Sequence, residues 1–551
     1  MTSQDTATLE QQAAAALHVE LLPGTEIMRE VGNAHFTHAR GSNVIDGFGL
    51  TPTNIPDPLN WPLPWKIMAI ISQTLFTFIA VMSALSMAPM FPLLGAEFHL
   101  HEQQLGLLTG VCVLALGYAN FVIVPCSNIF GRRFASIIFG SLAIATTIWE
   151  AEAKTHGSLL GARVLNGCAT ATSESIMVQV IADLFSIHER GLWTGVYFTS
   201  YFLGLFIGPV IAGNIANNHG WRSFFWLATG LSGLALLVII FMFPETKYHR
   251  CSSSQSTIES DTVHETTHNA KTMERAEIES TETDQAQLER ATTVNVGRRP
   301  SKSQFKLLQK PDKRWKQFLV RDIASPFQAF FFPIIFWAGL MVAGPANLLL
   351  LWNLTESSLL SAPPYTWDSS QVGFANFSFV IGGLIGLVSA GPFSDWIATR
   401  STKRNNGIRE AEMRLPALLP YIALTIIGIV VGGLGYQRLW PWEVILVIGY
   451  GITGMCVTTV PTIAIAYAID CYRPISGELM VVATILKNTC GFAMSYWVPS
   501  LSEEKGYLAP AMVMFAVVIG PGSLTIPLYY YGKSLRRMTK DSSMHRMEGM
   551  L

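Results

Sequence analysis

The sequence predicts an all-α polytopic membrane protein that is built from two six-helix bundles. Of the 551 residues, 50% are hydrophobic and only 14% are charged, against roughly 25% charged residues in an average soluble protein. Twelve apolar runs are long enough to cross about 30 Å of hydrocarbon, which takes roughly 20 helical residues. A polar stretch divides these runs into two sets of six.

The same composition excludes several classes of protein. A net charge of -1 lacks the broad basic field that nucleic-acid binding needs. The seven cysteines show no paired CxxC spacing, which argues against a zinc site or a disulfide framework. No His, Ser or Cys nucleophile pairs with a base inside the apolar runs. We therefore expect no enzyme activity, no cofactor and no nucleic-acid partner.

Each predicted span is placed by its apolar run. The first six cover 66–90, 104–126, 134–150, 159–184, 191–214 and 223–243. The last six cover 326–352, 371–393, 415–436, 441–469, 476–500 and 507–531. The expected regions are a mostly disordered amino-terminal tail (1–65), a first bundle (66–246), a linker (247–325), a second bundle (326–531) and a carboxyl-terminal tail (532–551).

The distribution of Lys and Arg predicts the orientation, because positively charged loops resist translocation. With the amino terminus in the cytosol, the short inside loops hold nine Lys and Arg residues and the outside loops hold four. The carboxyl-terminal tail is also basic, so we expect both termini in the cytoplasm. Asn353 then begins an Asn-Leu-Thr sequence just outside the seventh span, and this makes it a candidate for N-glycosylation.

The linker changes character along its length. Residues 251–290 are mixed to acidic and rich in Ser and Thr, whereas residues 298–321 carry nine Lys and Arg and one Asp among apolar side chains. The basic part is suited to contact with the anionic inner leaflet of the bilayer. A simpler interpretation is a charge run that stops translocation, and the sequence leaves both open.

A short motif recurs at the equivalent place in both halves. It reads Val124-Pro-Cys-Ser-Asn128-Ile-Phe-Gly131-Arg132-Arg133 after span two and Gly391-Pro-Phe-Ser-Asp395-Trp-Ile-Ala-Thr-Arg400 after span eight. A duplicated six-helix unit leaves such a pair. The motif resembles that of the major facilitator superfamily, which runs Gly, three residues, Asp, two residues, Gly and then basic residues. The resemblance implies the major facilitator fold, with this loop as a cytoplasmic latch between the halves.

Neither copy of the motif is complete. The first copy has Asn128 where the family has Asp, and the second has Ala398 at the later Gly. The charged part of the first latch is therefore in question. Charges at the inner end of span four, near Arg132, extend the expected gate, although a plain solvated interface explains them as well. The candidate gate residues are Asn128, Gly131, Arg132, Arg133, Asp183, Arg190, Asp395 and Arg400.

Span five contains Gly204-x3-Gly208-Pro209-x3-Gly213, which resembles the motif that marks antiporters within the superfamily. Glycines four residues apart let a neighbouring backbone approach closely. Pro209 removes one helix hydrogen bond and bends the helix. Ordinary small-residue packing would give the same spacing, so the motif indicates an antiporter only together with the resemblance.

Three further segments narrow the resemblance. They are Asp57-Pro-Leu-Asn60-Trp61-Pro62, Ala182-Asp183-Leu184-Phe185 with His188-Glu189-Arg190-Gly191, and Ile475-Ser476-Gly477-Glu478. These segments resemble the fungal twelve-helix drug:proton antiporter family, particularly its branch related to polyamine and cation carriers.

This family resemblance implies a proton-coupled carrier that exports a small amphipathic compound, such as a drug, toxin or secondary metabolite, by alternating access. The expected location is the plasma membrane, with the vacuole or another internal membrane as the alternative. A cation or polyamine carrier, possibly importing, is the rival hypothesis. A membrane sensor that signals through the linker is the third.

Charges inside the predicted spans are candidates for function, because a charge at mid-membrane costs several kcal/mol. Arg163 and Glu174 in span four are eleven residues apart and return to nearly the same helix face. Glu174 and Lys487 lie at about the same depth, roughly 15 Å from the cytoplasmic end. We therefore expect Glu174 to bind the transported proton, with Lys487 as its counter-ion and Arg163 beside them. A static structural ion pair is the alternative.

Polar and aromatic residues inside the spans are weaker candidates for a substrate cavity, since such groups more often serve packing or the interfacial belt. They are Tyr118, Asn120, Tyr197, Tyr201, Asn347, Trp352, Asn376, Asn488 and Tyr496.

Two other patterns resemble known sites without the required context. Gly449-Tyr-Gly451-Ile-Thr-Gly454 fits a dinucleotide fingerprint but lies inside an apolar span with no preceding strand. Glu97, His99, His101 and Glu102 are metal-ligand types in a short mixed loop, where such clusters arise by chance. We expect neither a nucleotide site nor a metal site.

Overall fold

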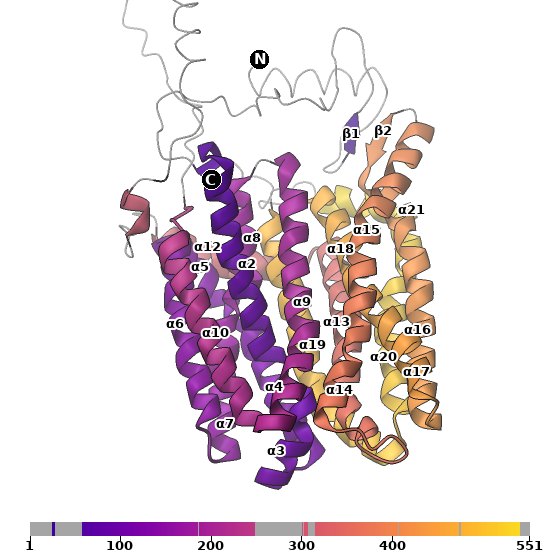
Figure 1. The fold of residues 1–551 in the computed structure, drawn as a ribbon. Coiled ribbons are helices and arrows are strands. Elements are labelled where there is room, and N and C mark those ends of the chain that lie inside the picture. The colour runs from indigo at the N-terminus through magenta and orange to yellow at the C-terminus, as the bar shows by residue number, and fades with distance from the viewer. Residues whose placement is uncertain are drawn as a thin grey trace, which may run out of the picture.

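The computed structural model describes residues 25–27, 58–185, 187–247, 300, 302–306, 315–405, 407–472 and 475–539. Within this part of the chain, long helices run side by side in two groups, coloured indigo to magenta and orange to yellow in Figure 1. The fold is therefore the predicted all-α membrane architecture of two helical bundles.

The first bundle consists of six helical spans and short connecting helices. The spans are α2 (Leu63–Leu85), α4 with α5 (Glu102–Tyr118 and Asn120–Phe130), α6 (Arg132–Ala151), α7 with α8 (His156–Thr170 and Thr172–Leu184), α9 (Ile187–His219) and α10 (Trp221–Met242). The short helices are η1 (Pro58–Asn60), η2 (Ala88–Met90) and α3 (Phe91–Phe98).

The second bundle has the same order of spans. They are α13 (Pro333–Leu360), α14 with α15 (Ser369–Ala375 and Phe377–Arg404), α16 (Leu418–Arg438), α17, η5 and α18 (Trp442–Val444, Ile445–Tyr450 and Gly451–Cys471), α19 (Ser476–Lys505), and α20 with α21 (Leu508–Ser523 and Thr525–Thr539). The helices η3 (Lys302–Phe305) and α12 (Trp315–Phe330) precede it, and η4 (Ala411–Ala417) lies within it.

Length and apolar composition identify ten membrane-crossing helices in the described residues, or eleven if the bent pair α20 and α21 is counted as one span. The remaining predicted span, 159–184, consists of α7 and α8, which are 15 and 13 residues long. Ala171 joins them and keeps right-handed helical angles, φ -60° and ψ -21°. The pair therefore continues as one helical segment although neither part is long enough alone.

One end of the molecule gathers residues from both ends of the described chain. Strand β1 (Thr25–Ile27) pairs antiparallel with β2 (Ile408–Glu410), in the loop after α15. In α21, Lys533 lies 2.5 Å from Glu410 and Arg536 lies 2.6 Å from Glu412. Residues 25–27, the loop after α15 and the end of α21 thus share one face, at the top of Figure 1.

The two bundles approach closely through glycines. A Cβ atom at Gly117 of α4 would lie 2.7 Å from the Cβ of Asn488 in α19. At the end opposite β1 and β2, a Cβ at Gly373 of α14 would lie 2.8 Å from the Pro209 carbonyl oxygen of α9. Glycine permits the close approach at both crossings, and at Gly373 the two bundles touch backbone to backbone.

An ion pair between Arg163 and Glu150 is enclosed within the first bundle. Arg163 in α7 donates to Glu150 in α6 at 3.2 Å, and both side chains are 0% exposed. Arg163 also donates to the carbonyl oxygens of Ser83 at 3.3 Å and Leu108 at 3.2 Å. The guanidinium therefore ties α7 to α2, α4 and α6.

A variant that lacks Arg163 alone should be less stable than a variant in which both Arg163 and Glu150 are replaced. Arg163→Met leaves the Glu150 carboxylate buried and unpaired, which costs roughly 3–5 kcal/mol. The double variant Glu150→Gln with Arg163→Met removes that charge and should recover most of the loss. Thermal unfolding of the purified protein measures both, and a single variant as stable as the double one would contradict the assignment.

Candidate functional site

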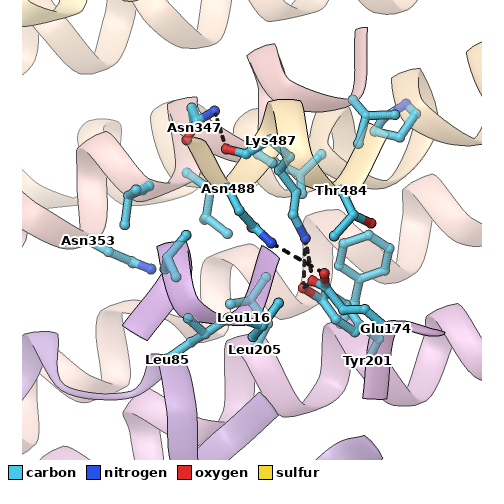
Figure 2. Close-up of a pocket in the computed structure, with 18 of the residues that line it drawn as sticks. Leu85, Leu116, Glu174, Tyr201, Leu205, Asn347, Asn353, Thr484, Lys487 and Asn488 are labelled. Carbon is cyan, nitrogen blue, oxygen red and sulfur yellow. Dashed lines mark hydrogen bonds and ion pairs between the residues drawn. The ribbon is translucent and has the colours of Figure 1, made fainter. Parts of the chain in front are cut away.

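A cluster of four polar side chains joins the two bundles at mid-depth (Figure 2). Lys487 Nζ in α19 lies 2.5 Å from Glu174 Oε1 in α8. The Tyr201 hydroxyl of α9 donates to the same oxygen at 2.8 Å, and Asn488 Nδ2 donates to Glu174 Oε2 at 3.4 Å. Lys487 Nζ also donates to the Tyr201 hydroxyl at 3.2 Å. The structure thus brings Glu174 and Lys487 together, as the sequence predicts.

Burial makes this pair interdependent. The side chain of Glu174 is 4% exposed and that of Lys487 is 18% exposed. Each charge removed from water needs the other as compensation, together with the hydroxyl and amide donors. Loss of one partner, or separation of the two helices, would leave an uncompensated charge in the bundle.

The pair borders a central cavity. Aliphatic and aromatic side chains from both bundles form most of its wall, while Glu174, Lys487, Asn347 and Asn488 provide polar groups. Such a wall suits a molecule with a large apolar body and few polar groups.

Of the residues predicted to face a substrate, four line this cavity: Tyr197, Tyr201, Asn347 and Asn488. Asn120 instead lines a neighbouring cavity. Tyr118 and Tyr496 are 46% and 59% exposed, and neither lines a described cavity.

Trp352 and Asn376, the other two candidates, are buried in the second bundle. The Trp352 indole donates to Thr453 at 3.2 Å, and Asn376 donates to Glu356 at 3.2 Å. Both side chains serve packing contacts in this conformation.

Arg163 does not join the central cluster. Its guanidinium pairs with Glu150 and with carbonyl groups of α2 and α4, as described above. The prediction that Arg163 shares a site with Glu174 is corrected, because the two residues are eleven positions apart, roughly 16 Å along a helix. A common helix face does not bring them to a common site.

The placement of Asn353 is also corrected. The seventh helix, α13, continues to Leu360, so Asn353 lies within it rather than outside the span. Its side chain is 8% exposed and lines the central cavity. A glycan needs an exposed acceptor, so this position does not suit glycosylation.

A second cavity adjoins the first. Glu174, Met480 and Thr484 line both. The second cavity extends toward the end that carries β1 and β2, where Asn128, Asp322 and Glu478 line it. Glu174 therefore sits between the two spaces.

The gate residues of the first bundle form a connected network. Arg132 donates to Asn128 at 2.6 Å and to Asp183 at 3.2 Å. Asn128 in turn donates to Asp322 of α12 at 2.5 Å. An amide can bridge a cation and a carboxylate, whereas an aspartate at this position would face Asp322 with a like charge. Asp322 thus supplies a carboxylate next to Asn128, the position at which the family motif has Asp.

Glu245, which follows α10, holds the start of α6. Its carboxylate accepts from the backbone N–H groups of Arg132 at 2.8 Å and Arg133 at 3.1 Å. Gly131 has φ +106°, and a Cβ there would collide with the same carboxylate. Arg133 donates to the Ile240 carbonyl at 2.8 Å, so it anchors α6 to α10 rather than reaching the second bundle.

The second motif uses a different arginine from the predicted one. Arg414 pairs with Asp395 at 2.9 Å and with Asp470 at 2.6 Å. Arg400 lies over the Trp396 ring, with its guanidinium carbon 5.8 Å from the ring centroid. The side chain of Arg190 lies outside the described residues.

The glycines of span five lie at helix contacts in α9. A Cβ at Gly204 would lie 2.6 Å from the Phe78 carbonyl of α2, and one at Gly208 would lie 3.1 Å from the Met82 side chain. Gly213 instead faces α14, where a Cβ would lie 3.1 Å from Gly373. The motif therefore packs α9 against its own bundle at one end and against the other bundle near Pro209.

Sequence reasoning missed several charged groups. Glu356 in α13 is 0% exposed, and the Asn376 amide donates to both of its oxygens, at 3.2 and 3.3 Å. It escaped notice because the predicted span ended at residue 352. Arg536 and Glu412 form a pair that was also missed, since they are 124 positions apart in sequence.

The glycine string that resembles a dinucleotide fingerprint and the residue Glu97 of the Glu and His cluster both make contacts between helices. Gly449 and Gly454 lie in η5 and α18, where a Cβ would contact Gly432 and Phe379 of neighbouring helices. Glu97 accepts from the Trp221 indole at 2.6 Å and pairs with Arg222 at 2.7 Å. Among the described residues, no group of three or more His, Cys, Asp or Glu side chains is placed to hold a metal ion.

Two helical bundles around a central cavity define a membrane transport protein. A family model described as Major Facilitator Superfamily matches residues 74–470. The chain therefore belongs to the Major Facilitator Superfamily.

Named relatives are fungal transporters of similar length. The MFS-type transporter C1271.10c of Schizosaccharomyces pombe is 26% identical, over 95% of this chain and 94% of the relative. The efflux pump vrtL of Penicillium aethiopicum is 25% identical, over 92% of each chain. The human organic anion transporter MFSD10 (TETRAN) is similar in fold, with a TM-score of 0.53 and 15% identity, over 84% of this chain and 99% of the other.

The Asn128–Asp322 contact can be tested by exchanging its partners. Asn128→Asp should open the second cavity to solvent, because the carboxylates at positions 128 and 322 would then face each other. We expect a cysteine at Val178, which lines the second cavity, to react about tenfold faster with a membrane-impermeant maleimide in a cysteine-free background. Adding Asp322→Asn restores one donor and one carboxylate and should return the rate to its starting value. A double variant that reacts as fast as Asn128→Asp would contradict the role of this contact.

Proposed function

We propose that this chain is a proton-coupled carrier that exports a small amphipathic compound by alternating access. The observation that carries the proposal is the Glu174–Lys487 ion pair, which joins the two bundles beside the central cavity. Alternating access requires the bundles to move relative to each other around such a site. A charge pair that spans the boundary links that movement to protonation.

The coupling follows from electrostatic compensation. With Lys487 beside it, the Glu174 carboxylate has its charge balanced. If the bundles rock and Lys487 withdraws, a carboxylate in a cavity with a mainly apolar wall takes up a proton rather than remain uncompensated. Proton binding then stabilises the conformation in which the pair is broken, and this supplies the differential interaction that drives a transition.

The cavity wall and the relatives favour an amphipathic substrate and export. The wall is mainly aliphatic and aromatic. The relatives include the vrtL and radE proteins, both named efflux pumps. The antiporter-like motif of α9 meets the second bundle at close glycine contacts near Pro209, and this placement supports the antiporter interpretation.

The membrane arrangement belongs to the same proposal. Both termini lie in the cytoplasm, and the protein resides in the plasma membrane. This places the β1–β2 face on the cytoplasmic side, and it agrees with the basic residues of the loop after α15. The helix α12 exposes Val320 and Phe327, which are 68% and 59% exposed, beside Arg321. Such a helix suits the interface of an anionic leaflet, whereas residues 307–314 of the predicted basic segment lie outside the described residues.

Transport driven by a pH gradient should depend on the carboxylate at position 174. The assay uses inside-out vesicles with an acidic lumen and any compound that the wild type concentrates. In these vesicles Glu174→Gln should reduce gradient-driven accumulation of the compound at least tenfold. Counterflow without a gradient should persist, because binding and rocking remain possible. The exposed Glu443 gives a control in Glu443→Gln, which should behave as the wild type. Undiminished gradient-driven accumulation in Glu174→Gln would remove this residue from the coupling.

A cation or polyamine carrier is the second candidate, and the second cavity favours it. Glu174, Asp322 and Glu478 line that cavity, and among the described residues Arg321 is the one basic side chain in its wall. Lys487 argues against a cationic substrate, since it occupies the Glu174 carboxylate.

Labelled spermidine should fail to compete with hydrophobic compounds in the vesicle assay if the substrate is amphipathic. Strong competition by spermidine would favour the cation carrier.

A further inference from the structure

Two polar atoms in the wall of the central cavity lack a hydrogen-bond partner. They are Thr109 Oγ1 of α4 and Asn353 Oδ1 of α13, and neither has a donor or acceptor among the described residues. The side chains are 6% and 8% exposed, and both line the cavity. Buried polar atoms are nearly always paired, so two orphans on one wall indicate a place where a ligand completes the bonding.

Contacts between the helices place Thr109 and Asn353 in the same part of the cavity. A Cβ at Gly106 of α4 would lie 3.6 Å from Leu354, and one at Gly491 of α19 would lie 3.0 Å from Asn347 and 3.1 Å from Val113. The helices α4 and α13 are therefore antiparallel, with Gly106 level with Leu354 and Val113 level with Asn347. Thr109 and Asn353 both lie between these two levels.

This region is separate from the ion pair. Asn347 donates to the Lys487 carbonyl oxygen at 3.2 Å, so it marks the level of the charged cluster on α13. Asn353 lies six residues further along the helix, which is roughly 9 Å. In Figure 2, Asn353 lies at one side and Glu174, Tyr201 and Lys487 lie at the other, with Leu85, Leu116 and Leu205 between them. The cavity thus has two polar ends and an apolar middle.

Other orphan atoms in the second bundle do not share this setting. Ser357 Oγ, one turn beyond Asn353, also lacks a partner and is 2% exposed, but it does not line the cavity. Thr459 Oγ1 is a similar case in α18. These residues separate the effect of an unpaired buried atom from the effect of an unpaired atom that belongs to a cavity-lining residue.

We propose that Asn353 and Thr109 form a second polar anchor that accepts a hydrogen bond from a hydroxyl or N–H group of the transported compound. The proposal rests on the proposed function and narrows its substrate class. The compound is an elongated, largely apolar molecule with a donor at one end for Asn353. A second polar group at its other end meets the cluster at Glu174 and Lys487. A compound without the far donor leaves Asn353 unpaired and binds more weakly.

Matched ligands test this anchor directly. The probes are estradiol, a rigid apolar molecule with one hydroxyl group at each end, and its 3-methyl ether, which lacks one donor. Displacement of labelled estradiol from the full-length protein in nanodiscs gives both dissociation constants, with empty nanodiscs as the correction for partitioning. The wild type should prefer the diol about fivefold, the range expected for one hydrogen bond.

The variants locate the preference. Asn353→Leu should abolish it, and Thr109→Val, which keeps the side-chain shape, should reduce it. Ser357→Ala should retain it in full. Equal binding of the two probes by the wild type, including no binding of either, overturns the anchor, as does a preference that survives Asn353→Leu. Loss of gradient-driven accumulation in Glu174→Gln concerns the proton coupling alone, so the two proposals fail separately.

Discussion

A charge inside the membrane must be compensated, and this constraint organises the structure. Glu150 with Arg163 and Glu412 with Arg536 are enclosed within single bundles, where they fix helices to one another. Of the ion pairs between described residues, Glu174–Lys487 is the one that joins the two bundles. Pairs within a bundle can stay closed throughout a transport cycle. A pair across the boundary has to change when the bundles move, and for this reason we propose that it takes part in proton coupling.

The spans and the central ion pair could be predicted from the sequence, whereas several other positions could not. Apolar length located the spans, and counting residues from the cytoplasmic ends placed Glu174 and Lys487 at equal depth. Helix periodicity failed for Arg163, because it shows which residues share a face but not which neighbouring helix that face meets. Glu150 is the last residue of the predicted third span, 134–150, and yet it is fully buried. Asn353 was placed outside the span because the predicted span, 326–352, has nearly the length of α13 but lies about seven residues too early in the sequence. Tyr118 and Tyr496 illustrate the same limit, because residue type does not encode whether a helix face meets the cavity or the lipid.

The contacts at the two ends of the bundles complement the central pair. Near α14, glycine and proline backbones of α9 pack directly against the second bundle. At the opposite end, Asn128 connects the first bundle to Asp322 on α12, the helix that precedes the second bundle. One end is held by close packing and the other by hydrogen bonds that include a carboxylate. Both kinds of contact can reform, so the arrangement suits a carrier that opens alternately to each side.

In the proposed transport cycle, protonation of Glu174 releases the two bundles from each other. Spin labels at Leu192→Cys of α9 and Trp396→Cys of α15, which are 71% and 58% exposed in the native chain, report the separation of the bundles by electron–electron resonance. As the pH falls, the distance distribution of the otherwise native protein should shift from one population to another. With Glu174→Gln added, the distribution should be the same at every pH. A pH-dependent shift of equal size in the Glu174→Gln protein would contradict the account.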